Sequence, residues 1–135
     1  MTPWLDFNPE ELRLFVAETE ELLEQLETGL LALEQGERSP QILNDVFRAA
    51  HTIKGSSATL GLEGMARLTH ALENRLDAWR SGQEVPSPDQ LAPVLSAVDL
   101  LRTMLMAVAD GNPPPDAPAQ LLQQLTAAPG PGGPP

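Results

Sequence analysis

The chain has 135 residues, enough for one domain with a single hydrophobic core. Its formal net charge of -11 repels nucleic acid and anionic lipid, so we expect neither as a partner. The absence of cysteine excludes disulfides and cysteine-ligated zinc, and the 4% aromatic content indicates an aliphatic core built mainly from leucine, which favours helices over sheets.

Helix start and stop signals divide most of the chain into four long segments. Asn8, Ser39 and Ser87 each stand directly before a proline, which is typical of an N-cap followed by the first helical position. The positions where the helices should end in a left-handed residue hold glycine: Gly36, Gly61, Gly82 and Gly111. We therefore expect four helices, at about residues 9–35, 40–60, 62–81 and 88–109.

Each of these segments carries apolar residues at helical spacing. In the first, the leucines at 23, 26, 30 and 33 recur at intervals of three and four, which predicts one apolar stripe along the helix. Because short links make neighbouring helices antiparallel, the pattern predicts an all-α fold, an antiparallel up-down four-helix bundle. The bundle's own core uses every stripe, so we expect the isolated domain to be a monomer.

The chain changes character after Gly111. Eight of the fourteen prolines lie there, and Asp116 is the only charged residue. A short additional helix is expected at about residues 117–126, packed on the bundle, which gives a domain of about residues 6–127. The Pro/Gly-rich residues 128–135 are typical of a linker, so we expect a longer protein.

The sequence shows no N-terminal targeting pattern and no stretch typical of a membrane span. The N-terminus has no basic segment followed by an apolar run, and no uninterrupted apolar stretch approaches the ~20 residues that span a bilayer. We therefore expect a cytoplasmic protein without membrane contact.

His51 is the most informative residue, because it stands three positions before Lys54, in a chain with only two histidines. Positions three or four apart share one face of a helix, so Lys54 and Gly55 should lie beside the imidazole. At 100° per residue, His51 lies roughly opposite the apolar stripe of its helix. The sequence therefore predicts an exposed imidazole next to a cation and bare backbone, a surface suited to holding an anion beside a nucleophilic nitrogen.

The other histidine, His70, stands three residues before Glu73 in the next helical segment. In an antiparallel hairpin about Gly61, His51 should lie near residue 71, since each is about ten residues from the turn. A carboxylate that accepts a hydrogen bond from one ring N–H would fix the tautomer and leave the other nitrogen as the nucleophile. Lys54 and His70 would then bind phosphoryl oxygens.

The sequence leaves two other interpretations open. A purely structural or dimerisation bundle would make His51 incidental. A metal-binding bundle would use His51, His70 and Glu73, although such sites usually recruit several inward-facing carboxylates from different helices. The chain has no glycine-rich phosphate loop, so we expect no ATP-binding site and no cofactor or metal in this domain.

The run from Phe47 to Ser57, FRAAHTIKGSS, is followed by Leu60-Gly61 and by THALE at residues 69–73. This combination resembles the histidine phosphotransfer (HPt) domain, in particular the N-terminal domain of chemotaxis-type histidine kinases. The resemblance covers roughly residues 6–127.

The resemblance implies a role for each residue of the pattern. His51 would be the phosphorylated residue, and Glu73 would be the carboxylate that orients its imidazole. Lys54 and His70 would give polar support to the phosphoryl group, and Gly55 would keep the approach clear for a partner.

The same resemblance implies a phosphorelay. The catalytic domain of a histidine protein kinase, on the same polypeptide beyond the linker or on its dimer partner, would phosphorylate His51. The receiver domain of a response regulator would then take the phosphoryl group onto an aspartate. ATP and Mg²⁺ are therefore expected on the kinase domain, and Mg²⁺ on the response regulator.

Overall fold

The computed structural model describes residues 8–127, which fold into five helices and contain no strand. The helices are α1 (Pro9–Glu34), α2 (Pro40–Thr59), α3 (Glu63–Arg80), α4 (Pro88–Ala109) and α5 (Ala119–Thr126). The predicted all-α class, a bundle with a short additional helix, is confirmed. That helix begins at Ala119 rather than at about residue 117, because Pro118 is extended and acts as its N-cap. The linker predicted at residues 128–135 lies outside the described residues.

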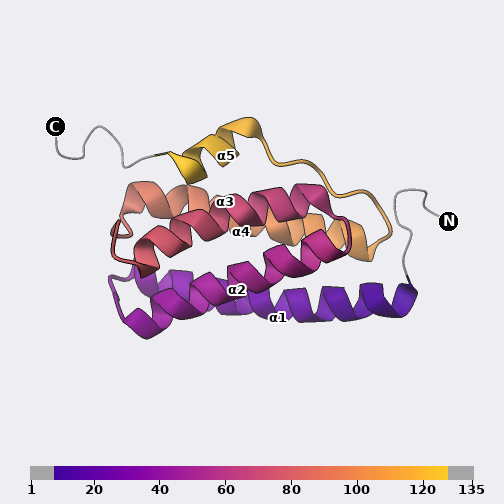
Figure 1. The fold of residues 1–135 in the computed structure, drawn as a ribbon, viewed down its shortest axis with the longest axis horizontal. Coiled ribbons are helices and arrows are strands. Elements are labelled where there is room, and N and C mark those ends of the chain that lie inside the picture. Colours follow the sequence, from indigo (N-terminus) through magenta and orange to yellow (C-terminus); the bar gives the residue numbers. More distant parts are fainter. Residues whose placement is uncertain (1–7, 128–135) are drawn as a thin grey trace.

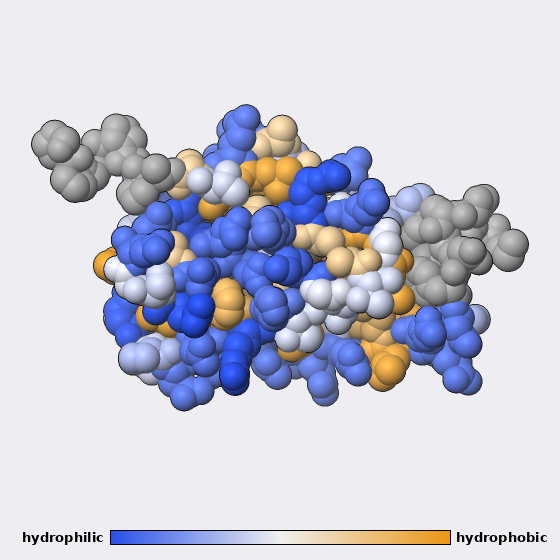
Figure 2. Space-filling model, viewed as in Figure 1, coloured by the Kyte–Doolittle hydropathy of each residue, from blue (hydrophilic) through white to orange (hydrophobic). Residues whose placement is uncertain are grey.

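The four long helices pack in a ring in which each contacts its neighbours in sequence and α1 also contacts α4 (Figure 1). The short α5 packs on α3 and α4, on the outside of the bundle (Figure 1). The core is aliphatic apart from Phe15 and Trp79, and its leucines in α1 are fully buried. The face seen in Figure 2 is mostly hydrophilic and shows its apolar residues in small separate patches.

The helix ends form where the sequence places them. The side chains of Asn8, Ser39 and Ser87 each accept a hydrogen bond from a backbone N–H in the first turn of their helix. Gly61 has a φ of 74° and turns the chain sharply between α2 and α3, a conformation that a side chain with a Cβ rarely adopts. This turn makes α2 and α3 the antiparallel hairpin that carries the candidate site.

A buried arginine fastens α5 to the bundle. Arg75 on α3 is 5% exposed, and its guanidinium pairs with Glu84 in the connection between α3 and α4. It also donates to the backbone carbonyls of Gln124, Leu125 and Ala127 at the end of α5. The last carbonyls of a helix have no partner inside the helix, so one guanidinium both satisfies them and fixes the position of α5.

Among the described residues, α4 is the one helix long and apolar enough to cross a membrane by length and composition. Half of its apolar window, 50%, is buried inside the bundle. Leu101 and Met104 on this helix have no exposed surface. Packing against α1, α3 and α5 thus accounts for the apolar composition of α4.

Candidate functional site

The hairpin of α2 and α3 brings His51 and Glu73 together. The imidazole Nδ1 of His51 is hydrogen-bonded to Oε2 of Glu73. The His51 side chain is 61% exposed, whereas that of Glu73 is 9% exposed. A buried carboxylate therefore holds one edge of an imidazole whose remainder faces solvent.

This hydrogen bond defines the tautomer of His51. An ionised carboxylate only accepts hydrogen bonds, so Nδ1 must carry the proton and donate it toward Glu73. In the neutral imidazole the lone pair then belongs to Nε2. The arrangement leaves a single nucleophilic nitrogen on the exposed part of the ring.

The ammonium of Lys54 also binds Glu73. Its Nζ donates to Oε1 at 2.7 Å, so each oxygen of the carboxylate has one partner. The sequence places Lys54 next to His51 for contact with phosphoryl oxygens, but in this structure the ammonium is committed to the carboxylate. The partner of Lys54 in this hairpin is thus Glu73.

The pKa of Glu73 reflects a competition between burial and its two partners. Burial removes water from the carboxylate and by itself would raise the pKa. The hydrogen bonds from Lys54 and from His51, together with their charges, outweigh burial, so the pKa lies below its ordinary value of 4.5. Glu73 is therefore ionised wherever the bundle operates near neutral pH.

The lowered pKa of Glu73 predicts a pH-dependent contribution to stability. A carboxylate whose pKa falls on folding stabilises the folded state above its unfolded pKa, and loses this effect as the pH falls through the folded pKa. We expect the difference in unfolding free energy between the wild type and Glu73→Gln to shrink as the pH falls below about 4.5. Urea unfolding over a pH series measures this difference. Glu18→Gln removes an exposed carboxylate from α1 and controls for net charge; a constant difference for Glu73→Gln would contradict the prediction.

His70 lies at the edge of this group. Its Nδ1 is 3.9 Å from Oε1 of Glu73, beyond hydrogen-bonding distance, and its side chain is 60% exposed. The structure thus places His70 on the same face as His51 without a direct bond to either partner of the pair.

Gly55 leaves the surface beside the imidazole open. It lies one turn after His51 and one turn before the end of α2, and a Cβ built on it would meet no atom within 4 Å. The space beyond this glycine is free solvent, so a side chain there would project outward beside His51.

Two further residues lie close to His51: Phe47 stacks on its imidazole, and Arg80 lies over Phe47. The ring of Phe47, one turn before His51, is stacked on the imidazole with centroids 6.0 Å apart and planes inclined by 18°. The guanidinium carbon of Arg80, at the end of α3, lies 4.1 Å from the centre of the Phe47 ring. The spacing of four residues on one helix is the signal that could have indicated the stack, whereas the position of Arg80 depends on how the two helices pack.

The metal-binding interpretation gains no support from the described residues. Within residues 8–127, no group of three or more histidine, aspartate or glutamate side chains is arranged to hold a metal ion.

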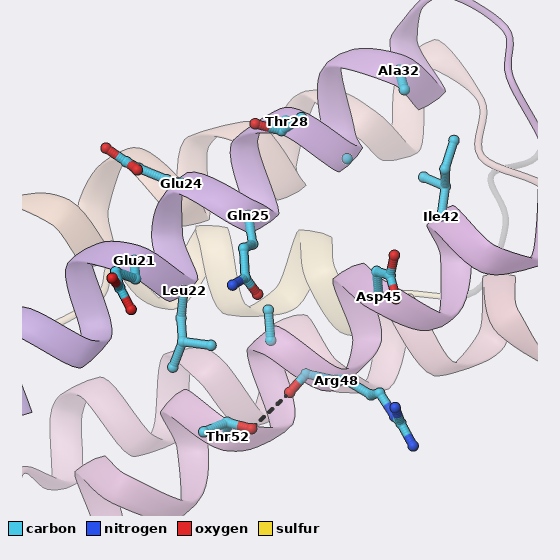
Figure 3. A pocket seen from close by; sticks show the side chains of 12 residues that line it. Glu21, Leu22, Glu24, Gln25, Thr28, Ala32, Ile42, Asp45, Arg48 and Thr52 are labelled. Carbon is cyan, nitrogen blue, oxygen red and sulfur yellow. Dashed lines mark hydrogen bonds between the residues drawn. The ribbon is translucent and has the colours of Figure 1, made fainter.

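A groove of about 930 Å³ lies between α1 and α2 (Figure 3). Its wall on α2 includes Arg48 and Thr52, and its rim on α1 includes Glu21 and Glu24. Figure 3 shows the Arg48 guanidinium extending away from α1. His51 and Glu73 are not part of the lining, so the groove does not contain the candidate site.

Comparisons with known proteins agree with this geometry. The model of the Hpt domain family matches residues 10–111. The chain is 43% identical over 108 residues to the chemotaxis protein CheA of Bacillus subtilis (strain 168), a match that covers 80% of this chain and 16% of that protein. The chain therefore spans about a sixth of the length of this curated relative.

Two solved structures share the fold. The CheA phosphotransferase domain from Thermotoga maritima is 38% identical, with a TM-score of 0.69 over 73% of this chain and 94% of that one. The phosphorylated P1 domain of CheA3 in complex with CheY6 from R. sphaeroides is 30% identical, with a TM-score of 0.75 over 86% of this chain and 92% of that one. Since the family model matches more than half of the sequence and these domains share its bundle, the chain belongs to the Hpt domain family.

Proposed function

We propose that this domain is a phosphorelay module of a chemotaxis-like two-component system, in which His51 receives a phosphoryl group and passes it on. The observation that carries the proposal is the exposed imidazole whose Nδ1 is held by the buried, ionised Glu73. A structural or dimerisation bundle has no need of a lysine and a histidine that share one buried carboxylate. The phosphorylated P1 domain in complex with CheY6 shows that a similar bundle carries a phosphoryl group.

The pair of His51 and Glu73 accounts for both steps of the relay. Nε2 attacks the γ-phosphorus, the new P–N bond forms, and the P–O bond to the leaving nucleoside diphosphate breaks. The ring then carries a positive charge with its proton still on Nδ1, next to the carboxylate of Glu73. In the second step a carboxylate of the receiver attacks phosphorus, the P–N bond breaks, and the electron pair returns to Nε2.

Glu73 therefore has two tasks. It fixes the reactive tautomer before the reaction, and its negative charge stabilises the positive ring that forms during it, as a carboxylate does for the histidine of a catalytic triad. Lys54 helps to keep the carboxylate ionised through its hydrogen bond and its charge. Phosphoryl transfer depends mainly on such positioning and electrostatics.

The partners follow from the same chemistry. The donor is the catalytic domain of a histidine kinase, which holds the ATP and Mg²⁺ that supply the phosphoryl group, and the acceptor is a Mg²⁺-dependent receiver domain. We propose that the domain spans about residues 6–127 and that residues 128–135 link it to further kinase domains, since CheA relatives are much longer than this chain. The relay would take place in the cytoplasm.

The direct test is phosphorylation by a CheA kinase domain. The purified chain is incubated with that domain, Mg²⁺ and labelled ATP, and the label is followed on this chain. We expect incorporation that is labile in acid and stable in alkali, as for a phosphorus–nitrogen bond. Label that is stable in acid, or label found elsewhere than on His51, would contradict the proposal.

Replacing Gly55 with a large side chain should slow phosphoryl transfer without lowering the stability of the fold. Gly55→Leu should slow phosphoryl transfer both from the kinase and to the receiver by about tenfold or more, since a bulky side chain would stand one turn from Nε2. The folded domain should be as stable as the wild type or more so, because leucine is favoured over glycine in a helix by ~1 kcal/mol. Transfer assays and thermal unfolding measure the two effects.

Gly55→Ala is the matched control for this substitution. It adds only a Cβ, which has no neighbour within 4 Å, so transfer should stay near the wild-type rate. Normal transfer by Gly55→Leu would show that this position does not control access to the histidine.

Removing the ammonium of Lys54 should slow phosphorylation less than Gly55→Leu does. Lys54→Ala should slow phosphorylation of His51 by up to about fivefold, because a partly exposed ion pair contributes ~0–1 kcal/mol and its loss leaves Glu73 and His51 in contact. Initial rates with the kinase measure the effect, and circular dichroism checks that helix content is unchanged. Lys54→Arg, which keeps the charge, should retain most of the rate; equal rates for Lys54→Ala and the wild type would contradict the role assigned to the ammonium.

A further inference from the structure

Glu73 alone does not fix the orientation of the exposed imidazole. The ring is attached to the chain through Cγ and is held by one hydrogen bond at the adjacent Nδ1, so both restraints act on the same edge. With 61% of the side chain exposed, solvent does not hold the remainder in place. A second contact on the face of the ring is required to fix the direction of Nε2.

The structure supplies that second contact in Phe47. The two rings lie one turn apart on α2, nearly parallel and at a separation within the range where stacked aromatic rings attract each other. The contact is with the face of the imidazole, whereas Glu73 binds its edge. Edge and face contacts together leave the ring one orientation.

Arg80 holds Phe47 in turn. Its guanidinium lies over the phenyl ring at 4.1 Å from the centroid, which is cation–π geometry, and it pairs with Asp77 at 2.5 Å one turn earlier on α3. Phe47 is half-buried, so its ring stands between the two helices where Arg80 can reach it. A continuous row thus runs from Asp77 through Arg80 and Phe47 to His51.

We propose that Phe47 and Arg80 are positioning residues for phosphoryl transfer: Arg80 fixes the phenyl ring, and the phenyl ring fixes the plane of the His51 imidazole so that Nε2 faces the incoming phosphorus. The inference rests on the proposed function of His51. It assigns to the end of α3 a part in the reaction although Arg80 touches neither the imidazole nor the phosphoryl group.

The test uses the 135-residue chain and a small donor, so that contacts with a protein partner play no part. Phosphoramidate transfers its phosphoryl group to an imidazole nitrogen, forming the P–N bond to His51 and releasing ammonia. We expect Phe47→Leu and Arg80→Gln to lower the rate of phosphorylation about two- to tenfold, the range of one aromatic or cation–π contact.

A second readout separates positioning from general stability. The three-bond couplings from the two Hβ protons of His51 to the ring carbon Cδ2, measured by NMR, report rotation about Cβ–Cγ: they differ from each other when one ring orientation dominates and become equal when orientations average. We expect unequal couplings in the wild type and averaged ones in Phe47→Leu and Arg80→Gln. Phe47→Tyr and Arg80→Lys, which keep the ring and the cation, should restore both the rate and the couplings.

Arg67→Gln is the matched control for charge, because it removes an exposed arginine from the same helix. An equal loss of rate in this variant would show a general charge effect and overturn the inference. Wild-type rates in Phe47→Leu and Arg80→Gln, or slower rates with unchanged couplings, would overturn it as well. If the wild type gains phosphate on His51 neither from phosphoramidate nor from the kinase domain, the proposed function fails and takes the inference with it.

Discussion

Replacing His51 with glutamine is expected to abolish phosphorylation by the kinase and to leave the bundle folded. The amide of glutamine has no nitrogen lone pair able to attack phosphorus, so no P–N bond can form. The side chain is 61% exposed and contributes nothing to the core, so its replacement should leave the bundle folded. Labelled-ATP incorporation and circular dichroism on one preparation measure both effects.

His70→Gln is the matched control, since it removes the chain's other histidine from the neighbouring helix. Its Nδ1 is 3.9 Å from Glu73, beyond hydrogen-bonding distance, so the variant should still be phosphorylated, with a rate lowered at most a few-fold. Incorporation at the wild-type level by His51→Gln would contradict the proposal that His51 is the phosphorylated residue. Loss of incorporation only in His70→Gln would move the phosphorylated residue to α3.

The fold could be predicted from the sequence because its signals are local. Caps such as Ser39 and the glycine at 61 act within one turn of the chain, and the apolar period depends only on neighbouring positions. The pairing of His51 with Glu73 could also be predicted, because a tight antiparallel turn fixes which residues face each other. Counting outward from the turn is enough to place both on the same level of the hairpin.

The remaining contacts could not be predicted, because they depend on the rotation of each helix and on long side chains. Lys54 reaches Glu73 instead of solvent, and no spacing rule within α2 indicates which acceptor it selects. Arg75 shows the same limit: its partners lie in a loop and at the end of α5, up to 52 residues away in sequence. A charged residue in a helix is normally exposed, so the apolar spacing along α3 does not indicate that Arg75 is buried.

Glu73→Ala should give a folded domain whose phosphorylation is slower by about ten- to a hundredfold. Groups that orient a base or stabilise its charge contribute on the order of 10²–10⁴-fold, and an orienter that acts on an exposed ring should lie at or below the low end. The variant frees the tautomer, removes the negative charge beside the ring and leaves Lys54 without its partner. Initial rates with the kinase measure the loss.

Glu73→Gln separates orientation from charge. Its amide oxygen can still accept the hydrogen bond from Nδ1, so the tautomer is kept, but the charge that stabilises the positive ring is gone. If orientation dominates, Glu73→Gln stays close to the wild type, and if charge dominates, it is as slow as Glu73→Ala. Glu63→Ala, an exposed carboxylate in the first turn of α3, should leave the rate unchanged. A wild-type rate for Glu73→Ala would mean that the carboxylate takes no part in transfer, and the chemistry of His51 would then depend on the exposed imidazole alone.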